Sequence, residues 1–326
     1  MRAVFIEAPG GPEVLKVREQ PSLAVPFGHV RVRVRYAGVN RADLLQRLGL
    51  YPPPPGAPKD VPGLEYSGAI DAVGEGVTRW SVGDRVFGLV AGGAYADEVV
   101  VHERETVKIP DALSDEQAAA VPEAFVTAYD ALVIRGGLTA GERVLIQAAG
   151  SGVGTAGVQI AHALGCLVIG TSRTQDKLGR CAALGLDVPI VPEKGAFADR
   201  VLDATAREGV DVVLELVGGP YLAEDLRACA SRGRIVVVGL TAGPMTELDL
   251  RLVLHKRATI VGTVLRARPL EEKIEAATML RKHIVPWLAS GAVKPLVDRV
   301  FPLAQAGEAH AYMASDASFG KVLLSM

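Results

Sequence analysis

Glycines gather at one place in the sequence, in a spacing that suits a phosphate group. The apolar run Val144–Ala148 leads into a glycine turn and then a helical pattern, and Gly152, Gly154 and Gly157 fit G-x-G-x-x-G. Such glycines let the backbone approach a pyrophosphate, whose charge the N–H groups of the helix start stabilise. A turn that only packs strand on helix is the alternative, but strands and helices alternate after it, which favours a dinucleotide site. The predicted contacts are Gly150, Ser151, Gly152, Val153 and Gly154.

The end of the next apolar run indicates which dinucleotide binds. An enzyme that uses NAD usually carries Asp or Glu there, about 20 residues beyond the turn, to hold the ribose 2′-OH. This chain has Ser172 and Arg173, and Lys177 follows one helical turn later. Donors and cations suit a 2′-phosphate, so we predict NADPH. A solvated helix start is the alternative for these residues.

The elements around the turn indicate a parallel sheet. Short apolar runs alternate with helical patterns, which is typical of βαβ units in a doubly wound fold. The runs are Val144–Ala148, Leu167–Gly170, Val188–Val191, Val210–Leu214 and Ile235–Gly239, and Thr259–Val264 is the expected edge strand. Helices are expected near Leu270–Ala289 and Leu303–Ala314, with a last strand at Lys321–Ser325.

The first part of the chain has a different pattern. Val30, Val32 and Val34 alternate with arginines, which indicates a half-buried strand. Further strands are expected at Tyr66–Val73, Arg85–Val90 and Glu98–Val101, with a stiff loop at Pro52–Pro55. Twelve of the twenty prolines precede residue 125 and four fall in residues 125–262, which marks a domain boundary.

Charge and composition exclude other classes of function. The 326 residues include 35 Lys and Arg against 37 Asp and Glu, a net charge of −2, so nucleic acid is not an expected partner. The 29 residues from Val144 to Ser172 carry no charge and could be mistaken for a membrane span. Gln147, Gln159 and His162 make a strand, turn, helix and strand the better interpretation. Three distant cysteines and the lack of an export signal predict a cytoplasmic protein.

Several motifs together resemble a known family. They are Gly38-Val-Asn-Arg-Ala-Asp43, Arg47-Leu-Gly-Leu-Tyr-Pro52, Pro62-Gly-Leu-Glu65, Val82-Gly-Asp-Arg-Val86, Gln117-Ala-Ala-Ala-Val-Pro122, Thr127-Ala-Tyr129 and the glycine turn. Over essentially its whole length the chain is similar to the zinc-independent, zeta-crystallin-like quinone oxidoreductases of the medium-chain dehydrogenase/reductase superfamily. Ser151, where the family usually has glycine, makes it most like the tumour-suppressor-induced subgroup.

The resemblance implies a fold and a set of site residues. A Rossmann NADPH-binding domain (125–262) would be inserted in a mostly-β, GroES-like catalytic domain (1–124 and 263–326). Tyr51, Asn40 and Thr127 would face the reacting groups. The alternatives are a surface loop residue for Tyr51, an Asx-turn at a helix start for Asn40 and a hydrogen bond back to its own helix for Thr127. Asp43 is a weaker candidate that could instead cap a helix or pair with Arg47. The implied cofactor site also includes Val217, Gly218, Gly239, Leu240, Thr241, Val264, Leu265, Arg266, Ser318 and Lys321. Where zinc-dependent relatives place their ligands, this chain has Asn40, Leu64 and Glu123, so no metal is expected.

The activity expected from this resemblance is NADPH-dependent reduction of quinones, ortho-quinones among them, by hydride transfer. Two alternatives are an enoyl or alkenal C=C reductase and an NADPH-binding protein without catalysis, as in lens crystallins. The apolar edge strand Thr259–Val264 would be an aggregation risk if left open, so we expect a homodimer paired through it.

Overall fold

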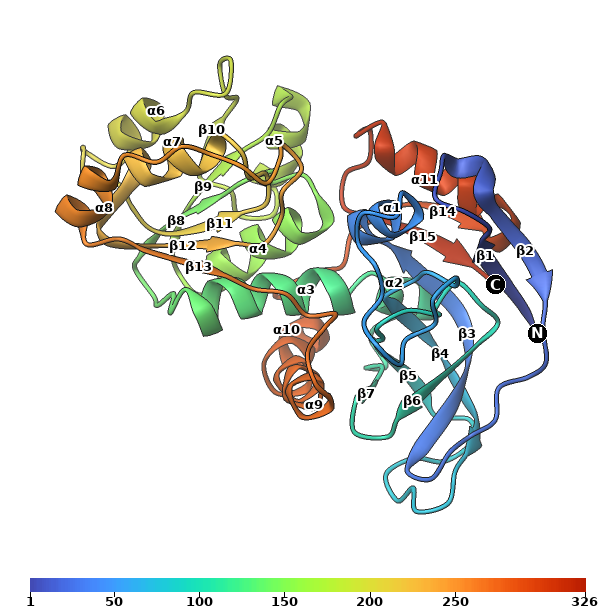
Figure 1. Ribbon diagram of the computed structural model, residues 1–326. Helices are drawn as coiled ribbons and strands as arrows, with labels where there is room; N and C mark the ends of the chain where they lie inside the picture. Colours follow the sequence, from blue (N-terminus) through green and yellow to red (C-terminus); the bar gives the residue numbers. More distant parts are fainter. The chain divides into compact units, whose positions relative to one another are not determined.

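Two units make up the computed structural model, which describes residues 1–326 (Figure 1). The first contains Met1–Val126 and Leu265–Met326, and the second contains Thr127–Val264. These boundaries lie two residues beyond those expected from the sequence.

The first unit is built around a seven-stranded sheet. Its strand order is β14-β15-β3-β4-β5-β7, with β6 paired to β3, and β1 and β2 form a separate antiparallel pair. The strands are β1 (Arg2–Ile6), β2 (Leu15–Glu19), β3 (His29–Val39), β4 (Glu65–Val73), β5 (Arg85–Leu89), β6 (Glu98–His102), β7 (Thr106–Lys108), β14 (Val297–Pro302) and β15 (Lys321–Ser325). The helices are η1 (Pro12–Val14), α1 (Arg41–Arg47), α2 (Asp115–Ala119), α9 (Leu270–Met279), η3 (Leu280–Ile284), α10 (Val285–Ser290), η4 (Leu303–Gln305) and α11 (Ala306–Ala314), and α3 (Pro122–Tyr129) crosses the boundary.

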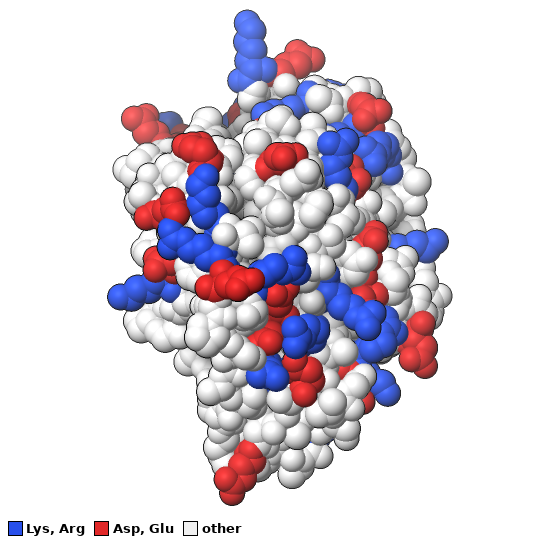
Figure 2. Space-filling view, turned by 90° about the vertical axis from the view of Figure 1, so that its right-hand side faces the viewer, with Lys and Arg blue, Asp and Glu red and all other residues white.

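Strand β3 explains how this sheet separates core from solvent. Val30, Val32 and Val34 are buried, while Arg31 forms an ion pair with Asp71 at 2.8 Å. Successive side chains of a strand point to opposite faces, so the valine and arginine alternation predicted from the sequence is confirmed. On the face in Figure 2, Lys and Arg are interspersed with Asp and Glu.

The second unit is a six-stranded parallel sheet with helices on both faces (Figure 1). Its order, β10-β9-β8-β11-β12-β13, is that of a doubly wound nucleotide-binding fold, and β13 is an edge strand as predicted. The strands are β8 (Arg143–Ile146), β9 (Leu167–Thr171), β10 (Val188–Ile190), β11 (Val210–Glu215), β12 (Cys229–Val237) and β13 (Thr259–Gly262). The helices are η2 (Asp130–Arg135), α4 (Gly152–Ala163), α5 (Gln175–Ala182), α6 (Ala198–Ala204), α7 (Tyr221–Ala228) and α8 (Leu250–Lys256).

The uncharged segment Val144–Ser172 folds as a strand, a turn, the helix α4 and a second strand, as predicted. Val144, Leu145 and Ile146 of β8 are fully buried, because helices cover both faces of a parallel sheet. None of the helices in the structure has both the length and the apolar character needed to cross a bilayer.

Candidate functional site

The glycine turn between β8 and α4 is a site for an anion. Ser151 is the N-cap of α4, and its Oγ accepts a hydrogen bond from the Gly154 N–H at 3.0 Å. The N–H groups of Gly152 and Val153, at the start of the helix, have no acceptor within the helix. The positive end of the helix dipole lies at the same place, so this turn can hold a phosphate.

Close packing explains the glycines of the turn. A Cβ atom on Gly154 would overlap the carbonyl oxygen of Ala148, and one on Gly157 would lie 2.9 Å from Cδ2 of Leu214 on β11. Ala148 itself has a φ of 47°, in the left-handed region that side chains other than glycine rarely adopt. The backbone is therefore held in a tight loop under the helix start.

The structure places the predicted 2′-phosphate residues after β9. Ser172 is buried, with its N–H bonded to the Ile190 carbonyl at 3.2 Å. Arg173 is exposed between β9 and α5, and Lys177 is half-buried in the first turn of α5. Both cations lie at the carboxyl end of β9, while their contact with a 2′-phosphate stays a prediction.

The loops after β11, β12 and β13 lie at the same edge of the sheet. The Ala242 N–H donates to the Val217 carbonyl at 2.7 Å, and a Cβ on Gly239 would overlap the Leu216 carbonyl oxygen, so the first two loops are packed together. Leu240 and Val264 are 52% and 57% exposed, and Thr241 is also exposed. The carboxyl edge of a doubly wound sheet is where such folds bind nucleotides. The structure thus brings together the predicted residues of this unit, except Thr127, which is buried in α3.

In the first unit, Asn40 and Lys321 form a cluster with Glu65. Lys321 Nζ lies 2.6 Å from Glu65 Oε1, and both side chains are almost completely buried. Asn40 donates from Nδ2 to Glu65 Oε1 at 2.9 Å, and its Oδ1 accepts from Lys321 Nζ at 2.5 Å. The resemblance made Asn40 a donor to the acceptor molecule and Lys321 a cofactor contact. In the structure both side chains are instead bonded to each other and to Glu65.

Glu65 connects this cluster to helix α3. Its Oε2 accepts a hydrogen bond from the backbone N–H of Glu123 at 2.7 Å. A carboxylate at a helix start satisfies an N–H group that has no partner within the helix and stabilises the positive end of the dipole. Glu65 therefore fixes the position of the Glu123 backbone, from which the Glu123 side chain extends.

Asp43 begins a second buried chain of hydrogen bonds. It accepts from the backbone N–H groups of Asn40 (2.8 Å) and Gly63 (3.0 Å) and from the Tyr95 hydroxyl (3.2 Å). Burial raises the pKa of Asp43 to about 6, although these bonds oppose the shift. Asp43 thus caps α1, one of its two expected structural roles, whereas Arg47 donates to the Gly10 carbonyl and not to Asp43.

The hydroxyl of Tyr95 also contacts His310 Nε2 at 3.1 Å, and Arg47 Nη1 lies 3.4 Å from His310 Nδ1. Burial and the charge of Arg47 lower the pKa of His310 to about 3. Because Tyr95 donates to Asp43 and Arg47 can only donate, His310 is neutral with its proton on Nε2. This buried chain holds α1 against α11.

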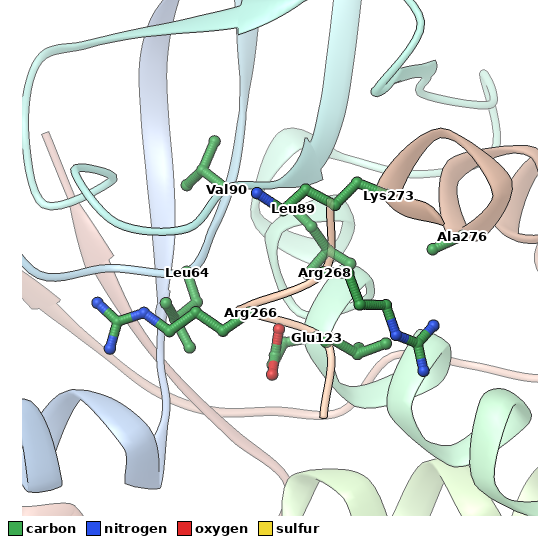
Figure 3. Close-up of a pocket in the computed structure, with 9 residues that line it drawn as sticks. Leu64, Leu89, Val90, Glu123, Arg266, Arg268, Lys273 and Ala276 are labelled. Atoms are coloured by element: carbon green, nitrogen blue, oxygen red, sulfur yellow. The ribbon is translucent and has the colours of Figure 1, made fainter. Parts of the chain in front are cut away.

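An open pocket of the first unit has Leu64 and Glu123 in its lining (Figure 3). Its walls are mainly apolar side chains and the stems of basic ones, and Glu123 is its acid. In Figure 3 the Glu123 carboxyl group faces Leu64 and the stem of Arg266, whose guanidinium group points away. The lining residues are Leu64, Leu89, Val90, Glu123, Leu265, Arg266, Arg268, Lys273 and Ala276.

Glu123 is in an unusual electrostatic setting. Burial, followed by the negative charge of Glu65, raises its pKa to about 8, against the opposing effect of Lys321. The carboxyl group is therefore mostly protonated at neutral pH, and a protonated carboxyl group can donate to an oxygen atom. In residues 1–326 no group of three or more His, Cys, Asp and Glu side chains is arranged to hold a metal ion.

Arg266 holds the loop that carries Tyr51. Its guanidinium group donates to the Ala91 carbonyl (2.8 Å), the Tyr51 carbonyl (3.2 Å) and Gln46 Oε1 (2.6 Å), and it lies 5.3 Å from the centre of the Tyr51 ring. Burial raises the pKa of the Tyr51 hydroxyl, so it stays protonated and can donate. Of the other two residues predicted in this unit, Leu265 lines the pocket and Ser318 is half-buried just before β15.

Three parts of these sites were not predicted from the sequence. Glu123 was only a position where zinc-dependent relatives place a ligand, and no local pattern connects Tyr95 with His310. Glu215 does carry a signal, because a carboxylate at the end of an apolar strand is a residue type that is rarely buried without a partner.

Known protein families match most of both units. A model described as "Alcohol dehydrogenase GroES-like domain" matches residues 27–111, and one described as "Zinc-binding dehydrogenase" matches residues 152–281.

Curated relatives include quinone oxidoreductases. The protein of Rattus norvegicus with that name is 33% identical over 328 residues, which cover 99% of this chain and 97% of the relative. Other matches span less of the relative. The match to the quinone oxidoreductase of Homo sapiens has 38% identity and covers 54% of this chain and 54% of the relative. The match to polyketide synthase GfsB of Streptomyces halstedii has 41% identity and covers 63% of this chain but 4% of the relative.

Solved structures resemble the whole chain. An NAD-dependent alcohol dehydrogenase has a TM-score of 0.90 at 32% identity, and the quinone oxidoreductase of Escherichia coli in complex with NADPH has 0.90 at 29%. CurK enoyl reductase has a TM-score of 0.86 at 28% identity. Each match covers 100% of this chain. It covers 100% of the alcohol dehydrogenase and of the Escherichia coli enzyme, and 99% of CurK enoyl reductase.

Proposed function

Because the chain belongs to the quinone oxidoreductase-like family of the medium-chain dehydrogenase/reductase superfamily, we propose that it reduces quinones with NADPH as the electron donor. Two observations support this proposal, each within one unit: the turn before α4 in the second unit can hold a phosphate, and an apolar pocket of the first unit contains a carboxyl group with a raised pKa.

The second unit fits a dinucleotide. The N–H groups of Gly152 and Val153 would bind the pyrophosphate at the start of α4. Arg173 and Lys177 after β9 favour a 2′-phosphate, which supports NADPH over NADH. When bound, the dinucleotide supplies a hydride.

The first unit fits the acceptor. A quinone that receives a hydride becomes a hydroquinone once it also receives one proton at an oxygen atom. The apolar walls of the pocket suit a flat carbonyl compound, and Glu123 holds a proton there at neutral pH. The proposal therefore assigns the proton to Glu123, which takes one back from water after each turnover. The Tyr51 hydroxyl is a second donor, with its loop held by Arg266.

Stopped-flow absorbance at the band of the reduced nicotinamide tests this function. Mixing the protein with NADPH and an ortho-naphthoquinone is expected to oxidise NADPH well above the background rate. Oxidation at the background rate with every quinone and enone offered would refute it. Replacing both Arg173 and Lys177 by Ala is expected to weaken NADPH more than NADH, and equal losses would refute the assignment of the 2′-phosphate.

Reduction of a C=C bond is a second candidate, supported by the similarity to CurK enoyl reductase. Such a substrate also needs one hydride and one proton, so the same pocket could serve it. Product analysis with 2-alkenals separates the two: a saturated aldehyde supports the second candidate, and an allylic alcohol or no product argues against it.

The subgroup and the assembly are also proposals. Ser151 in the glycine turn supports the tumour-suppressor-induced subgroup.

Around the edge strand β13, Ile260 is 37% exposed, and Leu250 and Leu254 of α8 are 68% and 76% exposed. Covering these side chains by pairing β13 with its two-fold copy would remove an aggregation risk, which supports a homodimer. Light scattering coupled to size exclusion is expected to give twice the chain mass, and a monomer mass would refute the dimer.

A further inference from the structure

Two carboxyl groups are buried side by side in the second unit. Glu215, the last residue of β11, and Asp225 of α7 are both 0% exposed. Each has one oxygen, Glu215 Oε2 and Asp225 Oδ2, that is buried without a hydrogen-bond partner. Burial, followed by the nearby carboxyl group of Glu215, raises the pKa of Asp225, so the two carboxyl groups lie close together. The proposed reaction uses neither group, so their arrangement needs another explanation.

The other oxygen of each group has well-defined partners. Glu215 Oε1 accepts from the backbone N–H groups of Val217 and Gly218, the second at 2.6 Å. Asp225 Oδ1 accepts from Gln147 Nε2 at 2.6 Å, and Gln147 in turn accepts from the hydroxyl of Thr171 on β9. The pair thus connects β8, β9, β11 and α7 just below the carboxyl edge of the sheet.

Two ionised carboxylates in contact cannot be stable here, since each would be desolvated and would repel the other. Glu224, on the same helix, is a further acid that raises the pKa of Asp225. The cations in the neighbourhood are Arg173, which acts on Tyr221, and Lys256 and Arg234, which act on Cys229. A single proton between the two carboxyl groups removes the repulsion and satisfies both oxygens that lack a partner. Burial and the contact with Glu215 raise the pKa of Asp225 well above its ordinary value, which supports Asp225 as the group that carries the proton.

We propose that Glu215 and Asp225 share one proton, carried by Asp225, and that this pair positions the 216–219 loop for nucleotide binding. Ionised Glu215 is then the acceptor for the two loop N–H groups. The loop depends on this support because Gly218 and Gly219 both have left-handed backbones, with φ of 71° and 54°. Val217 of this loop also accepts from Ala242 of the neighbouring loop.

The position of the proton makes the two amide variants unequal. In Asp225→Asn the amide replaces the protonated acid: Nδ2 donates to Glu215 Oε2, and Oδ1 still accepts from Gln147. In Glu215→Gln the loop N–H groups lose a charged acceptor. Asp225 must then either ionise where it is buried or keep a proton that has no carboxylate to accept it. We expect Asp225→Asn to be tolerated and Glu215→Gln to be destabilised.

The first experiment measures unfolding of the nucleotide-free protein by urea between pH 5 and pH 8. The folded pKa of Asp225 is raised, so its contribution is fully present below the unfolded pKa and is lost as pH rises toward the folded pKa. Between these two pKa values the unfolding equilibrium constant of the wild type should therefore rise with pH relative to Asp225→Asn, by up to about tenfold per pH unit. Equal pH slopes in the two proteins would overturn the shared proton. Glu247→Gln, at an exposed position of the same unit, is the control and should keep the wild-type slope.

The second experiment tests the role in positioning, which rests on the proposed function. NADPH binding to the three proteins, measured by calorimetry, should change less than about threefold in Asp225→Asn and weaken by at least about tenfold in Glu215→Gln. Equal affinities in all three would overturn the positioning role. If NADPH bound to none of them, the proposed function would fail, while the pH slopes would still decide whether the proton is shared. If Glu215→Gln did not fold, the pH slopes of the wild type and Asp225→Asn would still test the shared proton. Glu215→Asp, which keeps the charge on a shorter side chain, would then replace Glu215→Gln in the binding comparison, with the same expected loss of affinity.

Discussion

Replacing Glu123 by Gln tests the proton donor most directly. The pKa of Glu123 is raised to about 8, so the carboxyl group is protonated below that pH and ionised above it. Roughly nine-tenths of the molecules carry the proton at pH 7, and roughly one-tenth at pH 9. If the proton is needed, kcat/KM of the wild type should fall about tenfold between these two pH values.

The Gln variant keeps the size and polarity of the side chain but cannot transfer a proton. Its kcat/KM should be at least about tenfold below that of the wild type at pH 7, since general acids typically contribute more than this. It should also be nearly constant from pH 7 to pH 9, because the titrating group is gone. Single-turnover stopped flow with NADPH and an ortho-naphthoquinone measures both quantities.

The control is Glu19→Gln, at an exposed position on β2 of the same unit, which should keep the full activity and the pH profile of the wild type. NADPH affinity should not change in Glu123→Gln, which separates loss of the proton from loss of the cofactor. The same tenfold fall in the Gln variant as in the wild type would refute Glu123 as the donor, because another group would then carry the titration.

Three other substitutions test the packing that supports the sites. Gly154→Ala should abolish NADPH binding, measured by fluorescence titration, because its Cβ would overlap the Ala148 carbonyl oxygen. The control is Gly179→Ala on α5, whose Cβ would meet no other atom and which should bind NADPH normally. Ala148→Gly should raise the free energy of unfolding by about 0.5 kcal/mol, because it relieves a left-handed φ, and a lower urea midpoint would contradict this. Lys321→Met should cost about 3 to 5 kcal/mol in thermal unfolding, because it leaves the buried charge of Glu65 without a cation. Adding Glu65→Gln should restore part of the loss, and no restoration would argue against the ion pair.

Local patterns predicted much of the fold. The alternation of valine and arginine in β3, the glycine turn before α4 and the apolar runs of β8 to β11 all depend on neighbours within a few residues, so the sequence shows them. Elements without such a pattern were missed. The strand β7 has only three residues, β14 mixes charged and apolar ones, and β12 begins at Cys229, six residues earlier than expected, through a polar stretch.

The sequence by itself determined the parallel sheet, the place of the phosphate turn and the cations after β9, because spacing along the chain decides them. Only the tertiary structure decided which polar side chains remain available for chemistry. Asn40 and Lys321 lie 281 positions apart and are bonded to each other, while Glu123 faces an apolar pocket with its proton in place. The physical reason is that hydrogen bonding and protonation of a buried group depend on what the fold packs against it, and those partners are remote in sequence.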